Sequence, residues 1–452
     1  MEFGLLRQQL TKEYWFYHFA ENTEVKIMRK TTCIGLTAAL VVAATNLYAA
    51  NYWPDYRGPT HDGRSEAEGL PLHWSDKKNV VWKTAVHGRG WSSPVVANDE
   101  VWLTTATPDG KKLSGLCVDA KTGKIIWDKE LFSIPEPQFA HRFNSYASPS
   151  PLIEGEKVYL SWGSPGTACV DRKTKKIVWK RGDLVCDHFR GAGSSPLIYE
   201  NLLILTMDGA DVQYLIALDK ATGKTVWRKD RSTDFKDLDP NGKPKRGGDM
   251  RKSYATPILI EVAGKAQLLS PGAKSAFAYE PRTGKEIWAV RYANHSSASR
   301  TVYGNGLAFI NTGYAKAELL AVKPTGKGDV TDSHVVWRMI KGVPNNPSPL
   351  LVGEHLYLVT DGGVASCVAS KTGKVLWQAR VGGEYSSAPV CVGDRIYAFS
   401  QEGKAVVFRA SSEKFESLAE NKLGDGFMAS PAIAGKAFYL RSKTHLYRIE
   451  NK

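Results

Sequence analysis

The sequence has few of the short motifs that indicate a catalytic or metal centre. Its six cysteines include no adjacent pair and no Cys-x-x-Cys, so there is no signal for a zinc site, a haem attachment or a thiol relay. It also lacks His-Glu-x-x-His, Gly-x-Ser-x-Gly and a glycine-rich phosphate loop, which indicate common classes of hydrolase and nucleotide-binding enzyme. Function therefore has to be sought in longer patterns of the chain.

The composition is that of an ordinary globular protein. Of the 452 residues, 42% are hydrophobic and 23% are charged, which excludes a disordered chain, a coiled coil and a multi-span membrane protein. The net charge of +14 invites a nucleic-acid interpretation. However, many lysines recur in turns, as at Lys124, Lys224 and Lys374, and a repeat spreads such charges around a rim. We therefore expect no nucleic-acid partner.

A secretory signal peptide is expected at residues 28–50, where basic residues precede the apolar stretch Ile34–Ala44 and small residues follow it. Residues 1–27 then represent an over-long gene start, and the alternative is an uncleaved N-terminal anchor. Cys33 precedes the apolar stretch, so there is no lipid-attachment motif. We expect a monomer that is periplasmic or secreted, with no transmembrane span after cleavage.

A recurring tryptophan reveals an internal repeat. In the clearest unit Thr222-Gly223-Lys224 precedes Trp227, and six further tryptophans fill the same position at intervals of 40 to 61 residues. This interval matches the length of a four-stranded propeller blade. The indole offers a large apolar face for packing one blade on the next. The tryptophans to which we assign this structural role are Trp82, Trp127, Trp179, Trp227, Trp288, Trp337 and Trp377.

Two further signals mark the strands of each unit. A Ser-Pro pair or a close variant, such as Ser195-Pro196, opens seven of the units. Proline has no N–H and is tolerated where a strand edge is unpaired, so it predicts the innermost strand. The Thr-Gly turn needs a residue at positive φ, which glycine adopts without steric cost. Lys175 occupies this glycine position in one unit, and we expect a slightly strained backbone there.

The units add up to eight blades. Seven begin at a proline, and the eighth is the proline-less unit around residues 301–303. The last unit has only three strands, and we expect the N-terminal strand 80–84 to join this C-terminal blade and close the ring. The predicted fold class for residues 51–452 is therefore an all-β, eight-bladed β-propeller of four-stranded antiparallel blades that forms a single domain.

Three cysteines occupy one position of the repeat. Cys117, Cys169 and Cys367 align with alanines in the third strand of other units, so we expect small buried side chains there. Cys391 aligns with another apolar position. Cys186 lies in a connecting loop, and the sequence leaves its pairing open.

The loops from each tryptophan strand to the next proline strand converge on one mouth of the channel and form the candidate site. Their cations and aromatic rings would attract and stack a carboxylate- or phosphate-bearing ligand. The alternative is that these loops are polar only because they are solvated. The longest loop, residues 228–252, either covers the mouth or is mobile. The candidate ligand-binding residues are Trp91, Arg142, Asn144, Tyr146, His188, Arg190, Arg251, Tyr254, His295, Arg300 and Tyr385.

The repeat resembles the pyrroloquinoline quinone (PQQ) propeller-repeat superfamily. The likeness is carried by the unit Leu215–Trp227, by the opening Trp53-Pro54-Asp55-Tyr56-Arg57-Gly58-Pro59 and by the insertion Gly326–Thr331. It implies a propeller from about Trp53 to the C-terminus. The superfamily includes quinone-dependent alcohol dehydrogenases, a non-enzymatic propeller lipoprotein of outer-membrane protein assembly, and exported repeat proteins of unassigned role.

The resemblance implies either a quinone-dependent dehydrogenase or a non-enzymatic propeller. In the dehydrogenase branch the cofactors are PQQ and calcium, and calcium prefers oxygen ligands. None of the candidate oxygen donors matches a calcium motif, so no catalytic or metal-ligating residue is assigned. These donors are Asp249, Glu384 and Asp425 with Asn144, Asn294 or Asn345.

The function that we predict is an exported, non-catalytic propeller with a cationic funnel mouth. Its partner is an exported or outer-membrane protein, or an anionic small molecule or polymer such as a polysaccharide or phosphate polymer. The alternative is a PQQ- and calcium-dependent alcohol or sugar dehydrogenase of reduced size.

Overall fold

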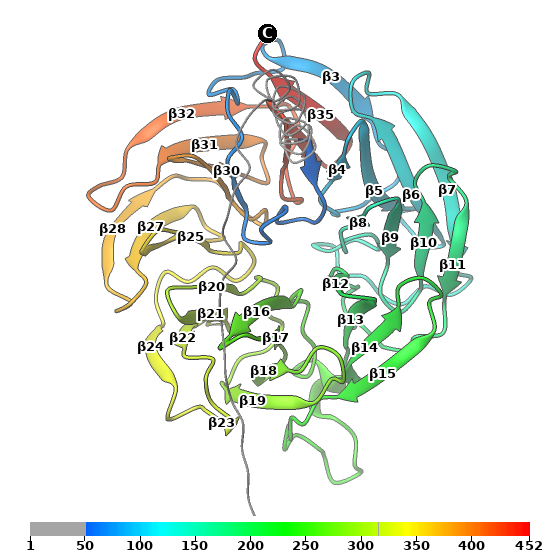
Figure 1. The fold of residues 1–452 in the computed structure, drawn as a ribbon, viewed down its shortest axis with the longest axis vertical. Coiled ribbons are helices and arrows are strands. Elements are labelled where there is room, and N and C mark those ends of the chain that lie inside the picture. The colour runs from blue at the N-terminus through cyan, green and yellow to red at the C-terminus, as the bar shows by residue number, and fades with distance from the viewer. Residues whose placement is uncertain (1–50, 315) are drawn as a thin grey trace, which may run out of the picture. The chain divides into compact units, whose positions relative to one another are not determined.

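The computed structural model describes residues 51–314 and 316–452. The predicted gene start (1–27) and signal peptide (28–50) lie outside these residues. The described residues belong to one compact unit and form eight small β-sheets around a central axis (Figure 1). The predicted eight-bladed β-propeller is confirmed. Within the described chain, no helix is long and apolar enough to span a membrane.

Blades 1 to 4 consist of consecutive antiparallel strands, which run in order from the innermost strand to the outermost. They are blade 1, β4 (Val95–Ala97), β5 (Glu100–Ala106), β6 (Lys112–Asp119) and β7 (Ile125–Ser133); blade 2, β8 (Leu152–Glu154), β9 (Lys157–Ser161), β10 (Thr167–Asp171) and β11 (Ile177–Arg181); blade 3, β12 (Leu197–Tyr199), β13 (Leu202–Asp208), β14 (Gln213–Asp219) and β15 (Thr225–Asp230); and blade 4, β16 (Ile258–Val262), β17 (Lys265–Pro271), β18 (Ser275–Tyr279) and β19 (Glu286–Arg291).

Blades 5 to 8 follow the same order. They are blade 5, β20 (Val302–Gly304), β21 (Leu307–Asn311), β22 (Leu319–Val322) and β24 (Val335–Met339); blade 6, β25 (Leu350–Val352), β26 (His355–Val359), β27 (Val364–Ala369) and β28 (Val375–Arg380); blade 7, β29 (Val390–Val392), β30 (Arg395–Phe399), β31 (Lys404–Arg409) and β32 (Ser417–Lys422); and blade 8, β33 (Ala432–Ala434), β34 (Ala437–Arg441), β35 (His445–Glu450) and β3 (Val80–Ala85).

The outer strand of blade 8 comes from the N-terminal part of the chain. β3 pairs antiparallel with β35, so that Val80 faces Ile449 and Ala85 faces His445. In Figure 1 the blue β3 lies beside the red C-terminal strand. A strand from the N-terminal part of the chain and the C-terminal strand are therefore joined by a ladder of backbone hydrogen bonds.

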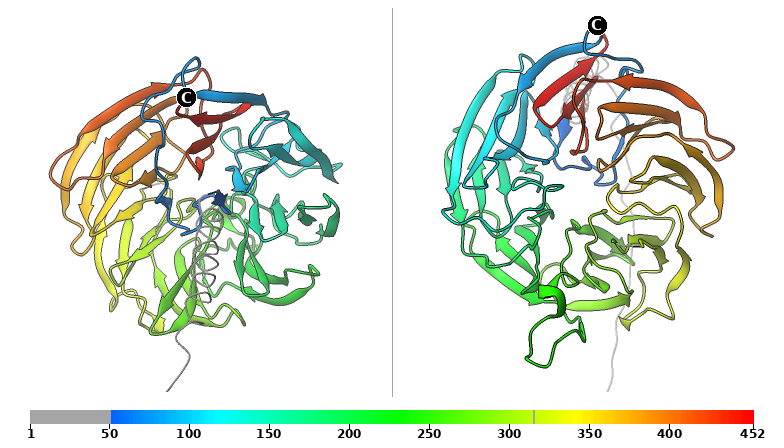
Figure 2. Two further views of the ribbon diagram at one scale, coloured as in Figure 1. Left: turned by 45° about the horizontal axis from the view of Figure 1, so that its top comes forward. Right: turned by 180° about the vertical axis from the view of Figure 1, so that it is seen from behind.

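The hydrophobic core lies between neighbouring blades. Residues of blades 3 and 4, for example Leu215 and Phe277, share one buried cluster, and blades 2 and 3, 4 and 5, 5 and 6, and 6 and 7 form similar clusters. Each four-stranded sheet presents apolar side chains on both faces, so it can bury them only by stacking between two others. Figure 2 shows this radial stacking from two further directions.

The recurring geometry of the tryptophans explains the glycine of the Thr-Gly turn. The Trp179 Nε1 donates to the carbonyl oxygen of Lys220 in the next blade at 3.0 Å. A Cβ atom on Gly223 would lie 2.7 Å from the same indole, and Gly223 has φ +73°. Glycine is therefore needed both for the positive φ and for the close approach of the neighbouring blade.

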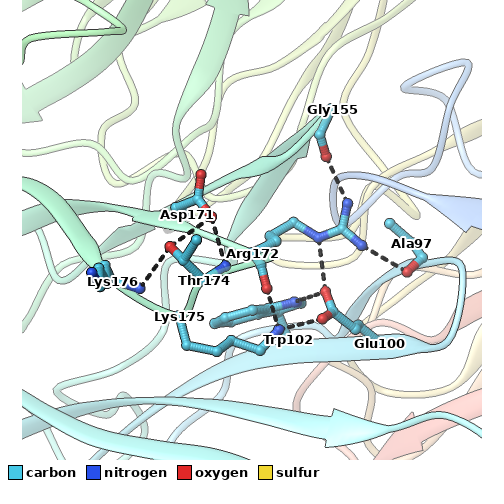
Figure 3. Close-up of polar contacts among 9 residues, drawn as sticks. All are labelled: Ala97, Glu100, Trp102, Gly155, Asp171, Arg172, Thr174, Lys175 and Lys176. Atoms are coloured by element: carbon cyan, nitrogen blue, oxygen red, sulfur yellow. Dashed lines mark hydrogen bonds and ion pairs between the residues drawn. The ribbon is translucent and has the colours of Figure 1, made fainter.

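Lys175 stands at the glycine position of the variant turn and has φ +60°. This confirms the expected left-handed backbone. Its ammonium binds Glu100 of blade 1 and lies 4.9 Å from the centre of the Trp102 ring (Figure 3). Arg172 donates to the same carboxylate at 2.9 Å. The ion pairs with blade 1 offset the backbone strain of a non-glycine residue at positive φ.

All five cysteines of the described chain are free and buried. Cys117, Cys169 and Cys367 each lie directly opposite a repeat tryptophan on the neighbouring strand, which confirms their expected role as small buried side chains. The Cys186 thiol lies 3.7 Å from the His188 Nδ1.

Each proline of the Ser-Pro pairs lies directly before an inner strand, and the residue before it links two blades. The backbone N–H of one such residue donates to the hydroxyl of the equivalent residue in the next blade, at 2.9 to 3.0 Å. We call the six acceptors the hydroxyl ring. They are Ser93, Ser150, Ser195, Thr256, Ser348 and Ser430.

The two remaining positions of this ring carry Arg300 in blade 5 and Ala388 in blade 7. Neither side chain has a hydroxyl that could accept the N–H of the preceding blade. The serine of the Ser-Pro pair therefore has its own structural role, which is to accept a hydrogen bond from the neighbouring blade.

Residues 51–65, which we call the inner segment, lie inside the ring of blades. β1 (Tyr52–Trp53) pairs with β4 of blade 1, and β2 (Arg64–Ser65) pairs in parallel with β29 of blade 7. The segment carries the whole opening motif, residues 53–59, that the sequence resemblance singled out. A further short strand, β23 (Gly328–Asp329), pairs in parallel with β19 on the outside of blade 4.

Candidate functional site

A cavity of about 560 Å³ lies where the loops between blades meet the hydroxyl ring. This volume is within the range of small-molecule sites, about 300 to 1,000 Å³. All six residues of the hydroxyl ring line it, together with Tyr56 of the inner segment. The ring and Tyr56 form what we call the floor of the cavity, and the loops form its wall.

Five of the eleven predicted ligand-binding residues line this cavity. The structure thus brings together residues from five different loops, as the repeat predicts for segments that converge on one mouth. The five are Trp91, Asn144, Arg190, Tyr254 and His295.

Arg190 is the cation whose donors are most available in the cavity. Its backbone is fixed because the Asn144 side chain donates to the carbonyl oxygens of Arg190 and Ala192, at 3.1 and 3.2 Å. Its guanidinium approaches Asp249 at 3.7 Å, which is too long for a hydrogen bond, and its side chain is 40% exposed. Within the described residues its side chain makes no hydrogen bond. The N–H donors of this planar guanidinium at the cavity therefore have no acceptor.

Lys252 is the second cation of the cavity wall, and it is almost fully buried. Its ammonium binds the side chain and the backbone carbonyl of Asp249. Burial lowers the pKa of Lys252, and the carboxylate opposes this shift. Burial would raise the pKa of Asp249, but the Lys252 ammonium holds it below its usual range. Both groups therefore stay charged and form one buried ion pair.

The two histidines of the cavity are held neutral by their surroundings. Burial, and next the Lys252 charge, lower the pKa of His295 to about 4. Burial, and next the Arg190 charge, lower the pKa of His141. With these imidazoles neutral at pH 7, Arg190 and Lys252 are opposed by Asp249 alone, so the lining carries one net positive charge.

Aromatic rings cover much of the wall. Trp91 donates its Nε1 to the carbonyl oxygen of Phe143 at 3.1 Å, and the Arg89 guanidinium lies 5.0 Å from its ring centre. Tyr254 and Tyr314 also line the wall, and the centre of the Tyr314 ring lies 6.2 Å from that of His295. These rings offer flat apolar faces next to the cations, which suits a ligand with a planar body and an acidic group.

The other six predicted residues do not line the cavity, among them Arg142, Tyr146 and Tyr385. Arg142 is exposed on the rim, and Tyr146 packs against the turn at Gly110, where a Cβ atom would lie 2.6 Å from the ring. Tyr385 is fully buried in the core between blades 6 and 7. Their loops converge as expected, but the sequence does not reveal which way each side chain turns.

His188 and Arg251 also differ from the expectation, because their polar atoms have partners elsewhere. The buried His188 accepts a hydrogen bond on Nε2 from the backbone N–H of Ser164 at 2.9 Å, and burial lowers its pKa to about 4. Arg251 pairs with Asp237 of the 228–252 loop. The tip of this loop projects outward beside β15 rather than over the centre (Figure 1).

Arg300 is the clearest correction. It is 1% exposed and pairs with Asp55 of the inner segment at 3.1 Å, so it holds that segment rather than facing the mouth. Its guanidinium also lies 5.3 Å from the centre of the Tyr56 ring. The sequence placed Arg300 in the right loop, but the partner that buries it is 245 residues away.

Two parts of the site were not predicted from the sequence. Tyr56 stood out only as part of the opening motif, and the hydroxyls of the Ser-Pro pairs were not expected to be ligand donors. The regular recurrence of serine before the proline was the available signal for the second part. Phe143 and Tyr314 carried no signal, because they occupy irregular loops.

Comparison with known proteins defines the family. Residues 114–249 and 262–452 match the family described as outer membrane protein assembly factor BamB. The chain belongs to this PQQ-like propeller family. Among solved structures, the BamB-family propeller is similar to BamB from Moraxella catarrhalis, with a TM-score of 0.56 and 14% identity over 82% of this chain and 99% of that one.

Two further proteins are similar to this BamB-family chain, one in structure and one in sequence. Quinohemoprotein alcohol dehydrogenase from Comamonas testosteroni aligns with a TM-score of 0.64 and 14% identity, over 90% of this chain and 82% of that one. Tetrathionate hydrolase from Acidithiobacillus ferrooxidans is 23% identical over 335 residues, which are 69% of this chain and 59% of that protein. The chain thus spans about three fifths of that relative's length.

The dehydrogenase neighbours raise the question of calcium and PQQ. Among the described residues that line the cavity, Asp249 is the sole carboxylate, and Lys252 already binds it. Glu384 is exposed outside the lining, and Asp425 accepts hydrogen bonds from Ser442 and Thr444. No group of three or more His, Cys, Asp and Glu side chains in residues 51–314 and 316–452 is placed to hold a metal ion. This donor set does not fit calcium, which takes six to eight oxygen ligands.

Proposed function

We propose that residues 51–452 act as an exported, non-catalytic binding propeller, and that the mouth cavity takes an anionic group. The group belongs either to a small molecule or to an acidic side chain or chain end of a protein partner. The BamB family assignment supports a binding role, because the family is described by its part in outer-membrane protein assembly.

The observation that carries this proposal is the free guanidinium of Arg190. A guanidinium prefers to bind a carboxylate or phosphate through two parallel N–H donors. Arg190 has a fixed backbone, lines a cavity of about 560 Å³ and has only a 3.7 Å approach to Asp249. An anion in the cavity would satisfy its donors without breaking any hydrogen bond of the protein.

The depressed histidine pKa values support the same conclusion. Burial is the largest cause of these lowered pKa values, and the positive charges of Arg190 and Lys252 that add to it also favour an anion at the same place. The aromatic wall then adds affinity for a ligand with a flat body.

The test compares anions with neutral analogues in thermal unfolding of the purified residues 51–452. Benzoate, 2-naphthoate and an acidic peptide would be matched with benzamide, 2-naphthamide and the amidated peptide. A ligand that binds only the folded state raises the melting temperature. We expect the acids, but not the amides, to raise it, and the peptide arm distinguishes a protein partner from a small molecule.

Arg190→Gln and Arg142→Gln form a matched pair of variants, since each removes one positive charge from the mouth. We expect Arg190→Gln to abolish the shift caused by the acids and Arg142→Gln to keep it, because Arg142 lies on the rim outside the cavity. The proposal is wrong if no acid shifts the melting temperature more than its amide, or if both variants behave alike.

A further inference from the structure

The hydroxyl ring has donors that the fold does not use. A serine hydroxyl has one O–H donor and two acceptor lone pairs. In the ring, Ser150 and Ser195 each accept a backbone N–H at 2.9 Å, from Ser93 and Ser150 respectively. Neither hydroxyl donates to another residue of the described chain, so both O–H groups remain available on the cavity floor.

Ser148 is already committed, because it donates to the Asn144 side-chain oxygen at 2.5 Å. Ser386 accepts from Gln401 at 2.9 Å and keeps its donor, but the loop that carries it brings no charge to the lining. Thr256 is hydrogen-bonded with Tyr56. The free donors of the floor therefore belong to the serines of the ring.

The charge of the wall is confined to one sector of the ring. Arg190 lies in the loop that leads to Ser195, and Lys252 lies in the loop that leads to Thr256. The loops that lead to Ser348, Ala388 and Ser430 contribute only neutral residues to the lining, among them Asn345 and Met428. Free O–H donors and free positive charge thus coincide only on the side of Ser150 and Ser195.

We propose that Ser150, Ser195 and Arg190 form an oxyanion subsite on the cavity floor. It takes the carboxylate or sulfonate of a small acid whose flat apolar body lies against Tyr254 and Trp91. This inference rests on the proposed function and adds the ligand class and the place of its acid group. Two hydroxyl donors and a guanidinium supply the hydrogen bonds that an oxyanion loses on leaving water.

Gly193 gives the subsite its shape. It lines the cavity between Arg190 and Ser195, and a Cβ atom there would lie 2.9 Å from Tyr254. The glycine thus lets the Tyr254 ring approach the floor closely. A ligand that reaches Ser195 therefore also meets an aromatic face.

The test compares Ser195→Ala with Ser430→Ala. Both changes remove one link of the ring, at 2.9 and 3.0 Å, and both serines line the cavity, but Ser430 lies in the neutral sector. The probe is 2-naphthoate, titrated by calorimetry against the purified residues 51–452. We expect Ser195→Ala to weaken its binding by about tenfold or more, since a hydrogen bond to a charged group is lost. We expect Ser430→Ala to change it by less than about twofold, and Ser195→Thr, which keeps the hydroxyl, to restore binding.

The outcomes separate this inference from the proposed function. If Arg190→Gln abolishes naphthoate binding but Ser195→Ala and Ser430→Ala have equal effects, the subsite is wrong and the binding function stands. If wild-type protein binds naphthoate no better than naphthamide, both are wrong. Equal losses of melting temperature in the two serine variants show that a difference in affinity does not come from destabilisation.

Discussion

Six of the eight equivalent positions, one in each blade, carry a hydroxyl, whereas Arg300 and Ala388 do not, and the two groups have different partners. At the six, a side-chain oxygen accepts the N–H of the neighbouring blade. Near the other two, the inner segment makes its buried charged contacts: Arg300 pairs with Asp55, and Arg57 donates to the carbonyl oxygens of Pro389 and Pro349 at 2.7 and 3.1 Å. In one part of the ring, hydrogen bonds to the serine and threonine hydroxyls link neighbouring blades directly. In the other part, which we call the bridged part, residues of the inner segment connect the blades.

The two parts differ in whether their polar groups remain available or are already bound within the protein. The direct links leave serine O–H donors free on the cavity floor. In the bridged part, the charged groups are instead bound inside the protein. Asp55 and Arg57 are almost fully buried, and the backbone N–H of Arg57 donates to the Asp55 carboxylate at 2.7 Å. The buried ion pair between Arg300 and Asp55 is costly to break, because removing one partner leaves an uncompensated buried charge.

The largest expected effect comes from breaking the bridge. Asp55→Asn removes the carboxylate that faces Arg300 and leaves a buried guanidinium without a countercharge. We expect the free energy of unfolding in urea to fall by about 3 to 5 kcal/mol. Asp183→Asn, which breaks the pair between an exposed Asp183 and a partly buried Arg181, is the control and should cost no more than about 1 kcal/mol. Similar losses in the two variants would show that the bridge does not carry the stability of the inner segment.

The bridge also predicts a dependence on pH. Burial would raise the pKa of Asp55, but the charges of Arg300 and His61 hold it well below its usual range. A carboxyl whose folded-state pKa is depressed contributes stability that is present above the unfolded pKa, about 4, and is lost as the pH falls. The difference in melting temperature between wild type and Asp55→Asn should therefore shrink below about pH 4. A constant difference from pH 7 to pH 3 would contradict this assignment.

The smallest expected effects on stability come from removing a hydroxyl at one position of the ring and adding one at another. Ser430→Ala leaves the buried Ala388 N–H without its acceptor and should cost about 1 to 3 kcal/mol. Ala388→Ser supplies a hydroxyl where the ring lacks one, and we expect a gain of about 0.5 to 1 kcal/mol. Chemical denaturation measures both. A loss of stability in Ala388→Ser would mean that the space beside the inner segment does not admit a hydroxyl.

The repeat was predictable because its signals are local. Each Thr-Gly-Lys turn, tryptophan and Ser-Pro pair acts within one unit, and eight copies of the pattern reinforce one another. The positive φ of Lys175 followed from the same alignment. The β-bulge beside each repeat tryptophan, for example between Ala217 and Leu218, had no separate signal.

The candidate site was predictable only in part. Loop membership followed from the repeat, and Trp91, Arg190 and His295 do line one cavity. The partners of the charged side chains did not follow, because they come from distant segments. Arg251 is paired within its own insertion, and Arg300 is paired with the N-terminus. The mouth is therefore less cationic than a count of loop residues suggests.

The sequence by itself determined the blades, their number and their order, because hydrophobic alternation and turn chemistry operate over a few residues and recur at a fixed spacing. Only the tertiary structure decided which cations remain free, since charge pairing depends on residues that are far apart in the chain but close in space. Arg190 lines the cavity with only a 3.7 Å approach to Asp249, while Arg300 is buried against Asp55, although both lie in equivalent loops of the same repeat.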